Sequence, residues 1–179
     1  MRPRTLARKK LKPILDFFER FGDCMAPCGL SYQQKAIARA QYALDRNLED
    51  TLTVCALLYD LDELVIKSLN QTASRTPLNK DKHAAECLKL TFPDHITKPI
   101  RLKAITKQYA SQPCTLESGT AKLFEESPWF FACMSLFQIE KKLLSQASTH
   151  SHNVSDIASY EELLLSQTLI LSRKEKQHA

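Results

Sequence analysis

The chain has 179 residues, 44% hydrophobic and 25% charged, which is typical of one soluble globular domain with a proper hydrophobic core. It contains only three glycines and neither a GxGxxG nor a GxxxxGK motif, which argues against a dinucleotide-binding or P-loop fold. The net charge of +5 is modest and does not by itself indicate a nucleic-acid-binding protein.

Much of the positive charge lies in residues 1–10, a basic N-terminal arm with no acid among them. Such an arm is able to contact nucleic acid or an acidic partner, but a solvated terminus is the favoured interpretation, and nucleic acid is disfavoured as a partner. No apolar segment follows that could serve as a signal-peptide core, and no run of residues is long and apolar enough to span a bilayer. A cytoplasmic protein without membrane contact is therefore expected.

Residues 11–174 are expected to form a single all-α domain, followed by a charged tail at 175–179. No alternating pattern typical of a strand is present. Ser31 is placed to cap one of the helices. Apolar residues at helical spacing predict helices over residues 11–21, 32–46, 80–90, 97–109, 128–144 and 155–171, with polar loops over 23–29, 70–79, 111–119 and 145–153.

The segment Thr51–Leu64, TLTVCALLYDLDEL, is predicted to be the centre of the fold. Its apolar run 54–58 is too short to cross a bilayer and is typical of a buried helix. The run ends in Tyr59 and Asp60. A carboxylate at the end of a buried helix is costly unless it meets a metal, a cation or hydrogen-bond donors, so the partner of Asp60 is the central question.

Six cysteines are spread through the chain, and the only close pair is Cys24 and Cys28. Without a second pair or an HxxxH motif, a zinc site is disfavoured against reduced thiols. No histidine is adjacent to Asp60 in sequence, and spacing alone assembles neither a Ser-His-Asp nor a Cys-His set. Nothing in these residues predicts a catalytic constellation.

The segment ALLYDLDEL, preceded by YQQKAIARAQYA, resembles an HD-domain protein whose signature has been eroded. Downstream, FPDHITKPIRLKAITKQY is similar to a segment of the HD-domain oxygenases, in particular the phosphonate-cleaving, PhnZ-type branch. The resemblance covers about Leu30–Leu144 and is most specific over Phe92–Tyr109. It implies a single helical HD-domain-like bundle.

Enzymes of that kind hold two irons with four histidines and two aspartates, and the resemblance places those positions here. The early histidine falls on Lys35, and the paired His and Asp that name the superfamily fall on Tyr59 and Asp60. The histidine that opens the next helix falls near Lys80, while the histidine of the RLH segment falls on Lys103.

Two further positions complete the set that the resemblance implies. The last aspartate falls near Glu140, and the lysine that contacts the anionic group of the substrate is retained as Lys107. A shift of one turn would bring His83 to the position given to Lys80, but the Phe92-Pro93 anchor argues against that shift.

These departures from the family pattern predict loss of the metal site. A protonated ammonium, with an ordinary pKa of about 10.4, offers no lone pair to iron. We therefore expect no metal, no cofactor and no catalytic residue, with lysines supplying the positive charge beside Asp60 and Glu140. The alternative is that the lysines extend to solvent and the cavity has collapsed around apolar side chains.

The sequence thus predicts a catalytically inactive HD-fold protein that acts as a binding or regulatory module. Its partner would be a protein or an anionic small molecule held in an electropositive pocket, which the resemblance lines with Lys35, Tyr59, Asp60, Lys80, Lys103, Lys107 and Glu140. The alternative is a divergent HD-domain metal-dependent phosphohydrolase or oxygenase with a rebuilt site. That site would hold one metal on Asp60, Glu140 and His83, or use Lys103 as a covalent nucleophile.

Overall fold

The computed structural model describes residues 3–71, 88–112, 115–146 and 156–177. Within these ranges the secondary structure is helical, and the only β feature is an isolated bridge between Met25 and Ser31, so the all-α prediction is confirmed. The elements are α1 (Pro3–Phe21), α2 (Tyr32–Asp45), α3 (Asp50–Leu58), α4 (Leu61–Gln71), α6 (Asp94–Arg101), α7 (Lys103–Ser111), α8 (Ser118–Glu125), α9 (Phe130–Gln146), the 3-10 helix η2 (Ile157–Tyr160) and α10 (Glu161–Gln177).

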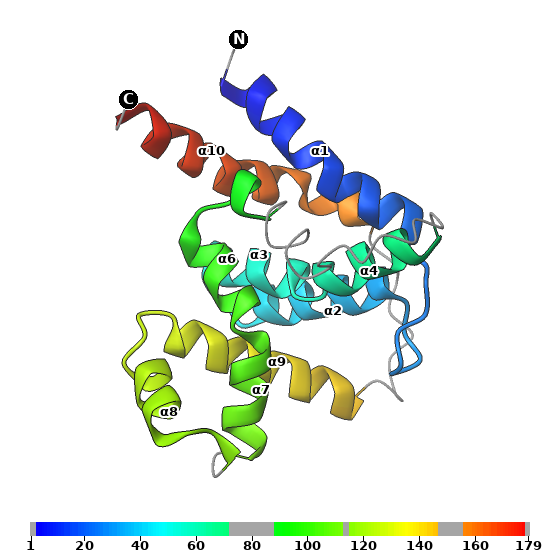
Figure 1. Cartoon of the computed structure of the whole chain (residues 1–179). Coiled ribbons are helices and arrows are strands. Elements are labelled where there is room, and N and C mark those ends of the chain that lie inside the picture. Colours follow the sequence, from blue (N-terminus) through cyan, green and yellow to red (C-terminus); the bar gives the residue numbers. More distant parts are fainter. Residues whose placement is uncertain (1–2, 72–87, 113–114, 147–155, 178–179) are drawn as a thin grey trace.

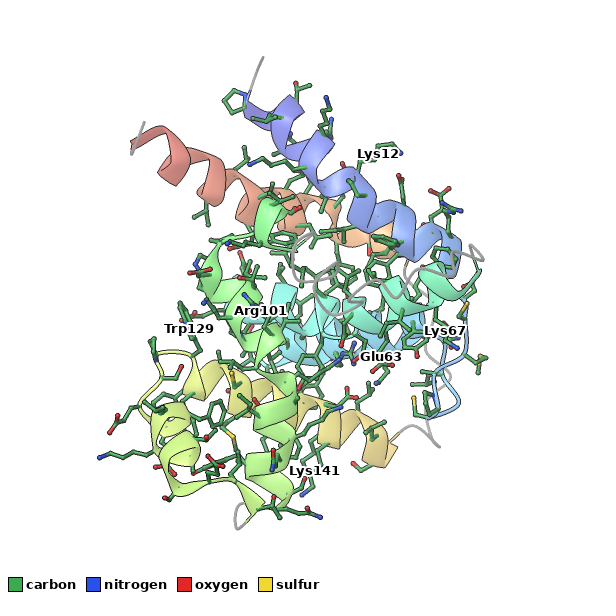
Figure 2. All side chains as sticks on the ribbon, in the orientation of Figure 1. Lys12, Glu63, Lys67, Arg101, Trp129 and Lys141 are labelled. Carbon is green, nitrogen blue, oxygen red and sulfur yellow. The ribbon has the colours of Figure 1, made fainter. Side chains whose placement is uncertain are left out.

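Helix α3 lies at the centre of the molecule (Figure 1). Helices α1 and α10 lie side by side along one outer side, and α2 and α4 occupy the middle with α3. Helices α7, α8 and α9 form the opposite side, while α6 packs against both α3 and α9. Side chains fill the space between α1 and the middle helices (Figure 2). The result is a helical bundle wrapped around one short apolar helix.

The burial of α3 explains this arrangement. The five residues 54–58 each have 0% of their surface exposed, which confirms the prediction of a buried helix. The helix ends at Leu58, and α4 begins at Leu61. Asp60 lies in the joint between the two helices and is only 4% exposed. The packing of α3 therefore places the Asp60 carboxylate in the interior, where it needs a partner of opposite charge or hydrogen-bond donors.

Helix α2 begins as the sequence predicted. The Ser31 hydroxyl accepts a hydrogen bond from the Gln34 backbone amide at 3.1 Å, and the Gln34 side chain accepts one from the Ser31 amide at 2.9 Å. This reciprocal pair is a capping box, and it satisfies two amides that the first helical turn leaves unpaired. Gly29, with φ of 83°, provides the left-handed residue that the preceding turn requires. The cap fixes where α2 starts, and hence the direction of its buried face.

The first helix departs from the prediction, because α1 begins at Pro3 rather than at Leu11. Of the basic residues in the expected arm, Arg4, Arg8, Lys9 and Lys10 are therefore part of a helix. Arg4 and Arg8 form ion pairs with Glu161 and Glu162 in the first turn of α10. Local sequence favoured a solvated arm, whereas acids more than 150 positions away pair with it.

Three other segments differ from expectation or lie outside the described residues. Helix α8 includes residues 118–119, which were expected to be loop, and residues 120–125, for which no element was predicted. The helix expected over residues 97–109 is two helices, because the backbone turns at Leu102 between α6 and α7. Of the helix expected at 80–90, only the end is described, where residues 88–91 are helical. Among the described residues, no helix has both the length and the apolar character needed to cross a membrane.

Candidate functional site: a buried cluster of four charges

Two cations on α2 face the carboxylate that follows α3. Lys35 and Arg39 are four positions apart, so both side chains project from the same face of the helix. Glu140 lies on α9, and its carboxylate contacts the same two cations. These three residues and Asp60 form what we term the four-charge cluster, in which each side chain is 9% exposed or less.

Each cation of the cluster bridges both carboxylates. The Lys35 ammonium lies 2.8 Å from Asp60 Oδ2 and 2.7 Å from Glu140 Oε1. Arg39 Nη1 donates to Asp60 Oδ2 at 2.6 Å and to Glu140 Oε2 at 2.8 Å. Two positive and two negative charges thus balance in a closed arrangement. Buried ions are tolerated when they are paired and hydrogen-bonded in this way.

Arg39 is anchored by more than its ion pairs. Its Nε donates to the backbone carbonyl of Ala56 at 2.9 Å, which fastens α2 to the last full turn of α3. Its guanidinium carbon lies 5.4 Å from the centroid of the Tyr59 ring, within reach of a cation–π interaction. With 1% of its surface exposed, Arg39 is one of the largest fully buried side chains among the described residues.

A third cation, Lys103 at the start of α7, closes the outer side of the cluster. Its ammonium lies 2.8 Å from Asp62 Oδ1, 3.4 Å from Asp60 Oδ1 and 3.8 Å from Glu63 Oε1. It also donates to the backbone carbonyl of Tyr59 at 3.2 Å. Glu63 lies between the ribbons of α4 and α9 in the view of Figure 2. Lys103 is therefore surrounded by oxygen atoms from residues 59–63.

The acids of the cluster are held in their charged form. Burial alone would raise the pKa of Asp60, but the charges of Arg39, Lys103 and Lys35 outweigh it and hold the pKa far below its ordinary range. Burial opposes charge on Glu140 as well, and Arg39 and Lys35 again lower its pKa. The contacts with Lys35 and Arg39 thus favour the charged form of both carboxylates.

The cations are held in their charged form by the same contacts. Burial alone would lower the pKa of Lys35, but the neighbouring Asp60 and Glu140 raise it above its ordinary value. The pKa of Arg39 is likewise raised, with burial outweighed by Asp60 and Glu140. Neither side chain can offer a lone pair while it is protonated, so neither can act as a metal ligand or a base.

The structure brings together most of the residues that the sequence singled out. Lys35, Lys103 and Glu140 all lie within ion-pair distance of Asp60 or of a residue bound to it, as the predicted lysine–carboxylate cluster requires. Lys35 does not extend to solvent, so the alternative of a collapsed apolar cavity is wrong for this residue. Tyr59 lies beside the cluster, with both Arg39 and Lys103 near its ring.

Other expected site residues are placed differently. Lys107, one turn beyond Lys103 on α7, is exposed and forms no ion pair with the cluster. Lys80 and His83 lie outside the described residues, so the choice between them stays a prediction. The expected pocket therefore reduces, in the described residues, to the four-charge cluster with Lys103 and Tyr59.

The sequence reasoning missed Arg39, which is the most deeply buried cation of the site. A transfer of family ligand positions considers only those positions, and Arg39 is not one of them. Its signal was the segment AIARA, in which a lone arginine follows Lys35 by four positions among small apolar residues. A charged residue on the buried face of an alanine-rich helix implies a buried partner.

The donor set does not fit a metal ion. Both oxygens of Asp60 and both oxygens of Glu140 already face ammonium or guanidinium groups at 3.4 Å or less. The described residues contain no group of three or more His, Cys, Asp or Glu side chains arranged to hold a metal. A divalent cation at this place would stand against positive charges that the core already holds.

Comparisons with known proteins add no assignment. No model of a known protein family matches the chain. No curated protein matches it at a significant level. The resemblance to HD-domain proteins therefore stays a prediction from the sequence segments that carry it.

Proposed function

We propose that this chain is a catalytically inactive protein of HD-domain type that acts by binding another protein, as a regulatory or scaffolding module. The observation that carries the proposal is the pair of bridges that Lys35 and Arg39 make between Asp60 and Glu140. In the family that the sequence resembles, this place holds metal ions. Here, protonated side chains provide the positive charge that two buried carboxylates need.

Fixed cations cannot replace the chemistry of a metal. A metal catalyst needs an open coordination position at which to bind oxygen, water or substrate. Lys35 and Arg39 stay protonated and have no lone pair, and their hydrogen bonds to Asp60 and Glu140 leave those acids no free role as ligand or base. The four-charge cluster therefore supports stable packing of α2, α3 and α9 rather than catalytic turnover.

The charge balance favours a protein partner over a small anion. Lys35, Arg39 and Lys103 are all paired with acids, and four acids face these three cations when Asp62 and Glu63 are included. An anion bound among them would add uncompensated negative charge. Lys107, expected to contact an anionic group, is exposed and apart from the cluster. The outer surface of the bundle is therefore the better candidate for binding.

Metal analysis of the whole protein tests the inactive state. We expect protein expressed in medium supplemented with iron, manganese and zinc, and purified without chelator, to contain far less than one metal ion per chain by inductively coupled plasma mass spectrometry. Chelator should leave its melting temperature unchanged. A tightly held metal near about one equivalent, removable only with loss of stability, would instead favour the rebuilt enzyme.

A thermal-shift panel separates the two kinds of partner. Phosphate, phosphonate, carboxylate and nucleotide anions should leave the melting temperature unchanged. A specific anion at 100 times its dissociation constant would stabilise the fold by about 2.7 kcal/mol, or roughly 5–10 °C for a chain of this size. A shift of that size that disappears in Lys103→Met but persists in Lys107→Met would place a small anion at the cluster and refute the choice of a protein partner.

A further inference from the structure

Two polar atoms beside the four-charge cluster have no hydrogen-bond partner in the described part of the chain. They are Arg39 Nη2 and Tyr59 Oη. Both residues are 1% exposed, so bulk solvent does not reach them. The other donors of the guanidinium that the structure pairs, Nε and Nη1, are bound to Ala56, Asp60 and Glu140. Buried polar groups are almost always satisfied by protein or by ordered water, so these two atoms need an explanation.

The two atoms belong to one region of the core. The Arg39 guanidinium carbon lies 5.4 Å from the Tyr59 ring centroid, so the two side chains are neighbours. Burial and then the nearby charge of Glu140 raise the pKa of Tyr59. Tyr59 therefore stays a neutral hydroxyl, able both to donate and to accept.

The chemistry around these atoms defines what can bind there. The ligand must accept a hydrogen bond from a guanidinium N–H, and it must exchange one with a phenol. It must be neutral, because the four-charge cluster is already balanced. It must also be small, because both side chains are almost completely enclosed. Water meets all four conditions, whereas chloride or phosphate fails the condition of neutrality.

We propose that Arg39 Nη2 and Tyr59 Oη bind an internal water molecule that is a permanent part of the four-charge cluster. The water accepts a hydrogen bond from Arg39 Nη2 and is hydrogen-bonded to the Tyr59 hydroxyl, so each of the two atoms gains a partner. This inference is independent of the proposed function, because it requires only the geometry of Arg39 and Tyr59.

The test compares Tyr59→Phe with Tyr42→Phe in the full chain. Tyr42 is a matched control because an arginine, Arg46, also lies over its ring, at 4.3 Å, but Tyr42 is only half-buried. Oxygen-17 magnetic relaxation dispersion counts internal waters with long residence times. We expect Tyr59→Phe to lose one such water and to melt at a lower temperature, while Tyr42→Phe keeps the count of the unmodified protein.

Opposite results would overturn the proposal. An unsatisfied hydroxyl is unfavourable, so its removal by Tyr59→Phe would raise the melting temperature and leave the water count unchanged. A melting temperature that depends specifically on chloride, and loses this dependence in Tyr59→Phe, would replace the water by an anion. If Tyr59→Phe does not fold, the presence of the water is tested in the unmodified protein instead. A nuclear Overhauser effect between the Tyr59 ring protons and a long-lived water supports the site, and its absence rejects it.

Discussion

The replacement of Arg39 by Met is the most informative single perturbation of this molecule. It keeps an unbranched side chain on the buried face of α2 but removes the guanidinium and its hydrogen bonds to Asp60, Glu140 and the Ala56 carbonyl. Lys35 would then be the one remaining cation of the cluster that contacts both buried carboxylates. The substitution therefore measures how much of the free energy of unfolding depends on the charge balance of the four-charge cluster.

The expected loss is large. Removing one partner from a buried ion pair typically costs about 3–5 kcal/mol, because the remaining charge stays buried without compensation. A domain of this kind has a total free energy of unfolding of about 5–15 kcal/mol. With an m-value near 2 kcal/mol per molar urea, the unfolding midpoint should fall by roughly 2 M.

Urea unfolding followed by circular dichroism at pH 7 measures this loss, with Arg46→Met as the matched control. Arg46 caps the same helix and lies over Tyr42, but it is exposed, so its replacement should cost less than about 1 kcal/mol. The loss for Arg39→Met should shrink toward pH 4, where the unpaired carboxylates can take up protons. A cost at pH 7 no larger than that of the control would refute the account of a buried, interdependent cluster.

Three further predictions concern pH and the backbone. The folded-state pKa values of Asp60 and Glu140 are lowered, so their contribution to the free energy of unfolding is complete above about pH 5 and is lost as pH falls below about 4. A series of urea titrations at different pH would measure this loss. A free energy of unfolding that rises below about pH 4 would contradict it. Gly22→Ala places a methyl group against a backbone carbonyl of the preceding helical turn and should cost about 1–3 kcal/mol, whereas Gly119→Ala meets nothing within 4 Å and should be neutral or slightly stabilising in thermal melts. Ser31→Ala breaks the capping box of α2 and should cost about 1 kcal/mol, and an unchanged melting temperature would show the cap to be dispensable.

Local sequence was sufficient where the pattern and the packing agree. The uninterrupted apolar run of α3 predicted a buried helix, and the acid at its end required a metal, a cation or hydrogen-bond donors, of which the structure shows cations. The positions of Lys35 and Lys103 came from the resemblance, since neither is near Asp60 along the chain. Family positions do not include Arg39, although its spacing of four from Lys35 placed both on one helical face.

The features that sequence did not predict depend on distant contacts. Helix α8 has eight residues and is fastened by an aromatic group in which Phe124 and Phe130 contact Tyr109 of α7. So short a helix is not stable by itself, and the residues that hold it are on other elements. The early start of α1 has the same cause, because the acids that pair with its arginines belong to α10.

The 101 positions that separate Arg39 from Glu140 have a consequence for synthesis of the chain on the ribosome. Until α9 has emerged, the two cations of α2 have only Asp60 to share, and a closed interior would trap an excess positive charge. The first four helices therefore have reason to stay loosely associated until α9 arrives. Electrical neutrality thus gives the core a reason to close only after Glu140 has been synthesised.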